Sequence, residues 1–237
     1  MAANGSKRKA VVSLTYDGTQ LCHAETALPH LDAFGLKGTF YADPLPLLDS
    51  LPLWRKALSD GHEIGNGCLI GTVDAGGAID SWTPEMVGDD IDDADSLLRE
   101  LFPGQNVFSF GYPWITAGAY GIVNLRRIVE QRHSVCRSGD QGMNEAQSVD
   151  LSYLRCAAMD GFTSNEMIEF VRSAGRLGQW IILAFDGIGS GDPSVDASAH
   201  YELCTWLNDS RDLVDVVTVS NAAQLAQGEA RPKLRLL

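Results

Sequence analysis

The sequence predicts one α/β domain, a (β/α) barrel of seven or eight strands with the character of a distorted TIM barrel. Two observations carry this prediction. Short apolar, β-rich runs alternate with helical patterns seven or eight times within 237 residues, which is the size of such a barrel. No internal repeat and no linker rich in Pro, Gly or Ser divides the chain, so residues 1–237 are read as a single domain. A doubly wound open sheet has the same local signature.

The strands are predicted from runs of apolar and β-branched residues bounded by turn residues. Each run is only three to seven residues long, as is typical of a strand in a compact domain. The expected strands are Ala10–Tyr16, Gly38–Ala42, Glu63–Gly65, Val107–Gly111, Ser134–Arg137, Tyr153–Ala157, Trp180–Phe185 and Val214–Val219.

Helices are expected between most of these strands. The clearest has Thr83 as N-cap and proline as its first residue, the arrangement that favours a helix start. The expected helices are Ala24–Phe34, Pro84–Leu101, Ser164–Leu177 and Ala199–Leu207.

Composition excludes several functional classes. Eighteen basic residues against thirty-one acidic ones give a net charge of −13, which disfavours nucleic acid and anionic lipid as partners. The longest apolar stretch, Trp180–Phe185, is too short to cross a membrane, and the first thirty residues lack a secretory apolar core. We therefore expect a soluble cytoplasmic protein with a small-molecule or carbohydrate substrate, and a homo-oligomer is a possible assembly.

Two further patterns have ordinary interpretations. The basic run Lys7-Arg8-Lys9 is read as a solvated lead-in to the first strand. The five cysteines, at positions 22, 68, 136, 156 and 204, form no C-x-x-C pair. An odd, scattered set of this kind predicts reduced thiols rather than disulfides or a cysteine zinc site.

Polar residues follow the predicted strands and mark a candidate site. In a parallel α/β fold, ligands bind beyond the carboxyl ends of the strands, where loops and helix N-termini converge. The residues at these ends are Asp17, Asn66, Cys68, Tyr112, Pro113, Trp114, Arg137, Asp160 and Asp186. Asp160 precedes Gly161 and is read as a turn residue, whereas Asp186 closes an apolar strand and is the strongest functional candidate.

Several blocks in this order resemble the polysaccharide deacetylases of carbohydrate esterase family 4, the NodB-homology superfamily. Ser13-Leu14-Thr15-Tyr16-Asp17 and Gly35-Leu36-Lys37-Gly38-Thr39-Phe40-Tyr41 resemble the opening motif of the family and the strand that follows it. Gly61-His62-Glu63-Ile64-Gly65-Asn66, Phe110-Gly111-Tyr112-Pro113 and Trp180 to Gly189 resemble its second, third and last motifs. The resemblance spans roughly Val11 to Leu207 and implies a deacetylase-like barrel.

The resemblance also implies a divalent metal, but the residues that would hold it are missing. Family members bind the ion through the second aspartate of the first motif and two histidines of the second motif. Those positions are Gly18, Gly67 and Gly71 here, and glycine has no side chain to offer a cation. The terminal histidine, which is a general acid in the family, is replaced by Asp186. Asp17, His23, Asp74 and Asp186 are the substitutes nearby, and we expect no metal and no other cofactor.

These substitutions predict a metal-independent hydrolase of an amide or ester bond, acting on an acetylated sugar or a small cyclic amide. Asp17 is the expected base and Asp186, protonated, the expected acid. His23 is a third catalytic candidate. Arg137, helix N-termini or backbone N–H groups of the 65–71 loop would stabilise the oxyanion. The expected substrate-binding residues are Asn66, Cys68, Tyr112, Trp114 and Arg137.

Other readings of the same residues remain open. Cys68 could act as a thiolate nucleophile with His23 as its base and Asp17 orienting the histidine. The pocket could be kept for carbohydrate or partner binding without catalysis. The two aspartates could instead serve a lyase or isomerase, and an unorthodox ligand set could still hold a metal.

Overall fold

The computed structural model describes residues 9–69, 83–105, 107–113, 122–145 and 148–228. Its strands are β1 (Ala10–Asp17), β2 (Gly38–Ala42), β3 (Glu63–Asn66), β4 (Phe110–Gly111), β5 (Cys136–Gln141), β6 (Leu154–Ala158), β7 (Trp180–Phe185) and β8 (Val214–Val216). The α-helices are α1 (Leu28–Ala33), α2 (Pro44–Asp49), α3 (Leu51–Ser59), α4 (Pro84–Leu101), α5 (Ile122–Glu130), α6 (Ser164–Leu177), α7 (Ala197–Asp209) and α8 (Val219–Ala226).

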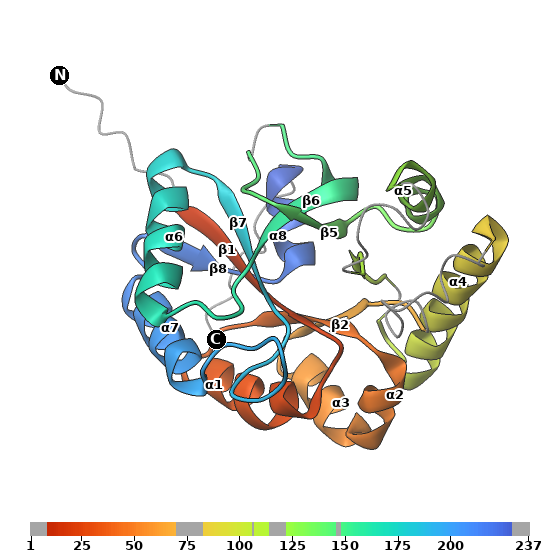
Figure 1. Ribbon diagram of the computed structural model, residues 1–237, viewed down its shortest axis with the longest axis horizontal. Coiled ribbons are helices and arrows are strands. Elements are labelled where there is room, and N and C mark those ends of the chain that lie inside the picture. Colours follow the sequence, from red (N-terminus) through yellow and green to blue (C-terminus); the bar gives the residue numbers. More distant parts are fainter. Residues whose placement is uncertain (1–8, 70–82, 106, 114–121, 146–147, 229–237) are drawn as a thin grey trace, which may run out of the picture.

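Strands β1 to β7 form a closed parallel barrel, as the sequence predicts. Each strand pairs with the next one along the chain, and β7 returns to β1 through six residue pairs, from Val11 opposite Trp180 to Tyr16 opposite Phe185. β2 closes the other side of β1, with Leu14 opposite Gly38 and Asp17 opposite Tyr41. The eighth strand, β8, pairs with the first three residues of β1. The helices surround the strands in the ribbon view (Figure 1).

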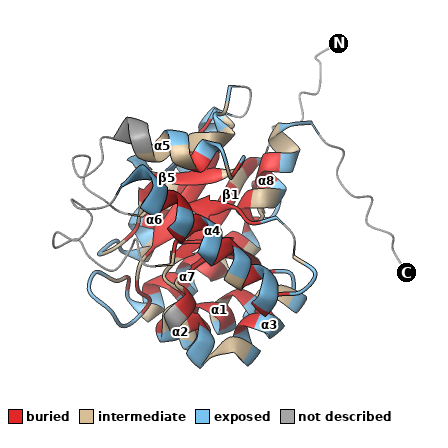
Figure 2. Cartoon of the chain, turned by 90° about the vertical axis from the view of Figure 1, so that its right-hand side faces the viewer, coloured by how far each residue is buried: buried red, intermediate tan, exposed pale blue. Residues whose placement is uncertain are grey.

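Alternate residues of each strand face the barrel interior or the surrounding helices. On β7, Trp180, Ile182 and Ala184 pack in an interior cluster with residues of α8, whereas Ile181, Leu183 and Phe185 belong to the large core beneath the helices. The strands are consequently buried on both faces, and exposed residues lie on the outer faces of the helices (Figure 2).

The interior at the amino end of the barrel is closed by α8 and a polar network around Glu63. The Glu63 carboxylate is 8% exposed and accepts hydrogen bonds from the hydroxyls of Thr39 (2.9 Å), Ser109 (2.5 Å) and Ser220 (2.5 Å) and from the Ser220 N–H (3.0 Å). Both oxygens of this buried carboxylate therefore accept hydrogen bonds. Because two of the donors belong to Ser220 in α8, the network holds α8 against the barrel floor.

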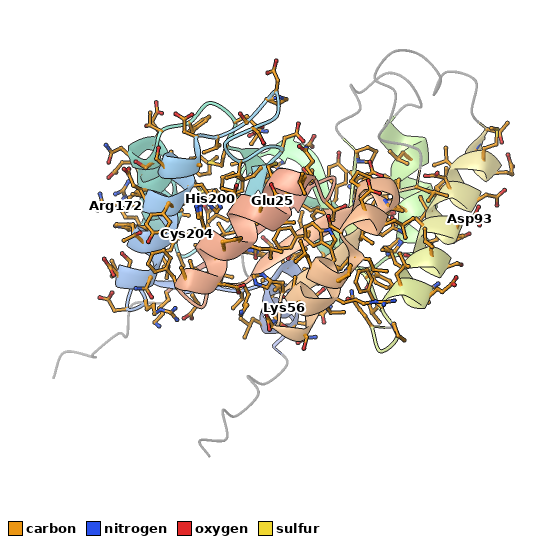
Figure 3. The ribbon with its side chains drawn as sticks, turned by 90° about the horizontal axis from the view of Figure 1, so that it is seen from below. Glu25, Lys56, Asp93, Arg172, His200 and Cys204 are labelled. Carbon is orange, nitrogen blue, oxygen red and sulfur yellow. The ribbon has the colours of Figure 1, made fainter. Side chains whose placement is uncertain are left out.

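On the outer face of β1, Tyr16 connects the strand to helix α7. Its hydroxyl lies 2.8 Å from His200 Nε2, and His200 Nδ1 lies 3.0 Å from His30 Nδ1 on α1. Figure 3 shows His200 and Cys204 on the same helix. Burial lowers the pKa of His200 to about 3, so this histidine is neutral and serves as a hydrogen-bonding link between α1, α7 and the barrel.

Four predicted elements differ clearly from the structure, whereas the bounds of the others agree to within two residues at each end. The expected helix Ala24–Phe34 is a π-helical turn, His23–Ala27, followed by α1, because Pro29 has no N–H to donate to the carbonyl of Glu25. The last expected strand ends at Val216, since Thr218 caps α8 by accepting from the Asn221 N–H. The expected strand Ser134–Arg137 is β5, Cys136–Gln141, and only the last two residues of Val107–Gly111 pair as β4.

Candidate active site

Inward-facing residues from four strands meet at the carboxyl end of the barrel. Asp17 ends β1 on the inward face that Val11, Ser13 and Thr15 share. Asp186 directly follows β7 in phase with the inward residues Ile182 and Ala184. Arg137 on β5 and Tyr41 on β2 complete this set. We call these four residues and Asp160, which lies two residues beyond β6, the barrel-mouth cluster.

Arg137 and Asp17 form an ion pair through Nη2 and Oδ1. The Arg137 side chain is 1% exposed and that of Asp17 is 15% exposed, so the pair lies largely out of water. The guanidinium carbon lies 4.9 Å from the centre of the Tyr41 ring, a cation–π geometry. The pKa of the Arg137 guanidinium is raised: burial acts to lower it, and the charge of Asp17 together with contributions from Cys156 and Tyr41 outweighs that effect.

Two glycines make room for the Tyr41 ring. A Cβ on Gly65 or on Gly111 would lie 2.6 Å from ring atoms of Tyr41. The ring therefore occupies interior space that side chains at these positions would fill. This packing gives a physical reason for glycine in the segments Gly65-Asn66 and Gly111-Tyr112, and it places a flat apolar surface beneath Arg137.

The surroundings of Asp186 favour the protonated form of its carboxyl group. Its pKa is raised from 3.8 to about 6, first by burial and then by the charges of Asp17 and Asp160, while a hydrogen bond from Gln20 lowers it. Gln20 Nε2 donates to both the carboxylate and the carbonyl oxygen of Asp186, each at 3.0 Å. Asp17 ends β1, the strand that pairs with β7 up to Tyr16 opposite Phe185, so its charge acts on Asp186 from the neighbouring strand.

Asp160 is the third acid of the cluster. Its Oδ1 accepts from the Asp186 N–H at 3.4 Å. Burial raises the pKa of its carboxyl, backbone hydrogen bonds oppose that rise, and the charge of Asp17 adds to it. Asp160 thus contributes to the raised proton affinity of Asp186, a role that goes beyond the turn residue expected from the sequence.

His23 lies behind Asp186 and is 0% exposed. Its Nε2–H donates to the Asp186 carbonyl at 2.7 Å, and its Nδ1 accepts from the Gln20 N–H at 3.2 Å. Burial lowers the pKa of the imidazole to about 4, against a smaller opposing effect of the Asp186 carbonyl. With both ring nitrogens engaged, His23 holds the Asp186 and Gln20 backbones in place.

Asn66 and Cys68 face helix α4 rather than the barrel mouth. The Asn66 amide donates to the carbonyl of Ile91 (3.1 Å) and to Asp95 (2.8 Å), and its Oδ1 accepts from the Cys68 N–H (2.7 Å). Burial, followed by the charges of Asp90 and Asp95, raises the pKa of the Cys68 thiol well above its ordinary value. That environment suppresses the thiolate which a nucleophilic cysteine requires.

Tyr112 also points outward, and its side chain is 5% exposed. Its ring makes edge-to-face contacts with Phe110 and Tyr153, and burial is the main cause that raises its pKa. The structure therefore places Asn66, Cys68 and Tyr112 together on the side of α4 and α5. Trp114, the remaining expected binding residue, lies outside the described residues.

The two described positions of the implied metal site, Gly18 and Gly67, do not fit the ligands of a cation. Gly18 has φ +91°, a conformation that an aspartate adopts only with strain. A Cβ on Gly67 would lie 2.7 Å from the backbone oxygen of Ala42, so a histidine cannot enter without moving β2. Gly71 and Asp74 lie outside the described residues. Within the described ranges, no group of three or more His, Cys, Asp or Glu side chains is arranged to hold a metal ion.

The 66–69 backbone is not available for oxyanion binding either. The N–H groups of Asn66 and Gly67 donate to Ser109 and Ala42 carbonyls, at 2.7 and 3.1 Å. Those of Cys68 and Leu69 donate to side chains, at 2.7 and 3.2 Å. Arg137, another of the expected oxyanion groups, does lie at the barrel mouth, where its guanidinium supplies positive charge.

Sequence reasoning missed three members of this arrangement: Gln20, Tyr41 and the electrostatic role of Asp160. Period-two counting along the strands would have found the last two. Thr39 and Tyr41 share one face of β2, and Leu154, Cys156, Ala158 and Asp160 are spaced by two residues along β6. Gln20 lies in the loop after β1, where no periodicity applies.

The fold and the inward carboxylates define a seven-stranded (β/α) barrel with an acidic, enzyme-like site at its carboxyl end. Solved structures place the chain within that class: it has the polysaccharide deacetylase fold. It is similar to the Xyl-CE4 domain of a multidomain xylanase from the hindgut metagenome of Trinervitermes trinervoides, with 13% identity, a TM-score of 0.62, and 95% of this chain and 94% of that chain covered.

Two other structures agree. The peptidoglycan deacetylase PdaC from Bacillus subtilis has 14% identity and a TM-score of 0.59, with 94% of each chain covered. A family 4 acetyl xylan esterase from Clostridium thermocellum, in complex with a cobalt ion, has 21% identity and a TM-score of 0.57, with 91% of each chain covered. At these identities the likeness establishes the fold.

Neither the models of known protein families nor the sequences of curated proteins match the chain. Among the described residues, no helix is both long and apolar enough to cross a membrane.

Proposed function

We propose that the protein is a deacetylase-like hydrolase that cleaves an amide or ester bond without a metal ion, with Asp17 as the base and Asp186 as the acid. The observation that carries the proposal is the raised pKa of Asp186, about 6, on the strand next to an Asp17 carboxylate that is ion-paired with Arg137. When the surroundings of two carboxyl groups move their pKa values apart, one can act as the base and the other as the acid.

In the proposed reaction, Asp17 removes a proton from a water molecule as its oxygen attacks the acyl carbon. The resulting tetrahedral intermediate carries a negative charge on the former carbonyl oxygen. Protonated Asp186 then donates its proton to the departing nitrogen or oxygen, so that the bond breaks to give a carboxylic acid and an amine or alcohol. A proton passing from Asp17 to Asp186 restores the starting state.

The remaining residues of the cluster act through these two acids. Arg137 orients Asp17 and supplies positive charge to the site, the function that a cation has elsewhere. Gln20 and His23 are positioning residues, because they fix the carboxylate and the backbone of Asp186. The charge of Asp160 adds to the burial and the Asp17 charge that raise the pKa of Asp186 to about 6.

Charge limits the substrate. Three carboxylates and one guanidinium gather at the barrel mouth, so the site disfavours anionic substrates. A neutral amide or ester, such as an acetylated sugar or a small cyclic amide, enters without this penalty. The carboxylate product of either reaction is repelled, which favours its release.

The test uses protein purified without a metal-binding tag and assayed in excess chelator against acetylated sugars, cyclic imides and ureides. Asp17→Asn and Asp186→Asn are each expected to lower kcat/KM by about 100-fold or more, the usual contribution of a positioned acid or base. Asp196→Asn is the matched control, because Asp196 is exposed and its side chain caps no helix N–H.

Four outcomes would overturn the proposal in distinct ways. Activity that is abolished by chelator and restored by a stoichiometric metal ion removes metal independence. Wild-type rates in both aspartate variants remove the acid–base assignment. Saturable sugar binding without turnover of any compound favours the non-catalytic binding protein that the sequence also allows, and turnover without hydrolysis favours a lyase or isomerase.

A further inference from the structure

A pocket lies at the opposite end of the barrel from the candidate active site. Its volume is about 530 Å³, and it is lined by residues from the end of α6, from α7 and from the start of β8. Lys9 precedes β1, Gly178 precedes β7 and Val214 begins β8. All three positions are at the amino ends of strands, so this amino-end pocket does not share its opening with the barrel-mouth cluster.

The walls of the amino-end pocket are largely apolar. Val171 and Val214 are buried, and Trp206 forms part of the side. Leu177 and Leu213 remain 67% and 55% exposed at the opening. The volume and the apolar lining are those of a site for a small molecule, and exposed leucines at an opening mark a surface that gains from being covered.

The charged side chains that line the same pocket are mostly basic. They are Lys9, Arg172 and Arg176, against the single acid Asp212, in a protein whose net charge is −13. Arg172 stacks on Trp206, with its guanidinium carbon 5.3 Å from the ring centre, and Figure 3 shows Arg172 at the outer edge of the molecule.

Arg176 is the cation best placed for an external anion. Lys9 pairs with Asp215 at 3.1 Å and Arg172 pairs with Glu169 at 2.5 Å. Arg176 donates to the Ser173 hydroxyl at 2.9 Å and makes no ion pair with any of the described residues. Its planar guanidinium retains donors in the geometry that binds a carboxylate through two hydrogen bonds.

We infer that the amino-end pocket binds an amphipathic carboxylate, with the apolar part of the ligand against Trp206, Leu177 and Leu213 and the carboxylate on Arg176. The segment that precedes Lys9 is a poor alternative occupant, because it carries Lys7 and Arg8 and would meet like charge at the rim. The inference does not depend on the proposed hydrolase activity.

Sodium decanoate is the probe, titrated into the full-length protein by isothermal titration calorimetry, with decan-1-ol as the uncharged analogue. Decanoate is expected to bind with 1:1 stoichiometry and a dissociation constant below about 1 mM, at least tenfold more tightly than decanol. Arg176→Glu should weaken decanoate binding at least tenfold. Leu213→Asp should weaken both probes, because it places a charge against the apolar part of the ligand.

Arg127→Glu is the matched control, since Arg127 is an exposed arginine in the last turn of α5, as Arg176 is in the last turn of α6. Circular dichroism and the thermal midpoint verify that each variant is folded. The inference is overturned if decanoate does not saturate, if decanol binds equally well, or if Arg127→Glu has the same effect as Arg176→Glu. Concentration-dependent dimerisation that Arg176→Glu abolishes would assign the face to a second copy of the chain and also overturn it.

Discussion

The Arg137 guanidinium and the Asp17 carboxylate are ion-paired inside the barrel, with the arginine side chain 1% exposed and the aspartate side chain 15% exposed. The two residues come from strands that are not neighbours in the barrel, β5 and β1. Their pairing therefore connects opposite parts of the barrel wall through its interior. Replacing only one partner of such a buried ion pair costs folding free energy, because the other charge is left buried without a partner.

Removing the arginine alone should destabilise the protein strongly. We expect Arg137→Met to lower the free energy of unfolding by about 3–5 kcal/mol, and the double variant Arg137→Met/Asp17→Asn to lose less than the sum of the two single variants. Urea denaturation of all four proteins measures this coupling. The exposed pair Arg132–Asp92, at 2.9 Å, is the control, with an expected coupling below about 1 kcal/mol. Additive losses at the barrel mouth would show that the pair is not coupled.

The proposed acid sets the pH dependence of the reaction. Because Asp186 must be protonated and has a pKa of about 6, kcat/KM should fall about tenfold for each pH unit above 6. Asp160→Asn removes one of the charges that raise this pKa, and its amide oxygen can still accept from the Asp186 N–H. The alkaline limb should therefore move to lower pH in this variant. A limb at the wild-type position would contradict the coupling of the two acids.

The same raised pKa should cost stability above pH 6. Between about pH 4 and pH 6 the folded protein holds a proton on Asp186 that the unfolded chain has already released, so stability decreases as the pH rises through this interval. A rise from 3.8 to about 6 corresponds to at most about 3 kcal/mol. Since Asp186 is half-buried, screening by solvent reduces the expected effect to about 1 kcal/mol.

Asp186→Asn is accordingly expected to be inactive and yet more stable than the wild type at pH 8. The two proteins should have equal stability near pH 3.5, where the carboxyl is protonated in both the folded and the unfolded chain. Thermal unfolding across this pH range measures the difference. A variant that is less stable at pH 8 would show that the charge of Asp186 stabilises the fold.

The backbone of β2 lies close to Gly67, so a side chain at this position should be costly. Gly67→Ala should destabilise the protein by about 2–3 kcal/mol, because its Cβ would lie 2.7 Å from the Ala42 carbonyl oxygen. Gly175→Ala is the control: its Cβ would meet Ala10 at an ordinary 3.7 Å, and alanine is the better helix former. Equal stability of the two variants would show that the backbone at Gly67 yields easily, and that a metal-binding histidine could be restored there.

The residues at the strand ends could be predicted from the sequence. Whether each of them reaches the site depends on which face of its strand it lies on. The sequence analysis placed Asp17, Asn66, Tyr112, Arg137 and Asp186 together at strand ends. In the structure, Asn66 and Tyr112 have the outward phase and pack beneath α4 and α5, whereas the other three face inward. A one-residue difference in phase turns a side chain from the barrel interior to the helices.

Other features depended on tertiary contacts that local patterns do not report. The raised pKa of Asp186 arises from burial and from carboxylates on two other strands. The space that Tyr41 occupies is created by glycines on β3 and β4. The strand β4 pairs over two residues only, because its neighbours rather than its own β-propensity set its length.

The position of β1 has a consequence for synthesis of the protein on the ribosome. β1 pairs with β2, β7 and β8, and two of these three partners are translated more than 160 residues after it. Until then its apolar outer face, from Ala10 to Tyr16, has no complete covering, and the nascent chain must wait for its final third before the barrel can close. Slow closure of this kind is the expected cost of a topology whose ends meet, and it makes the last helices as necessary to folding as the strands of the site itself.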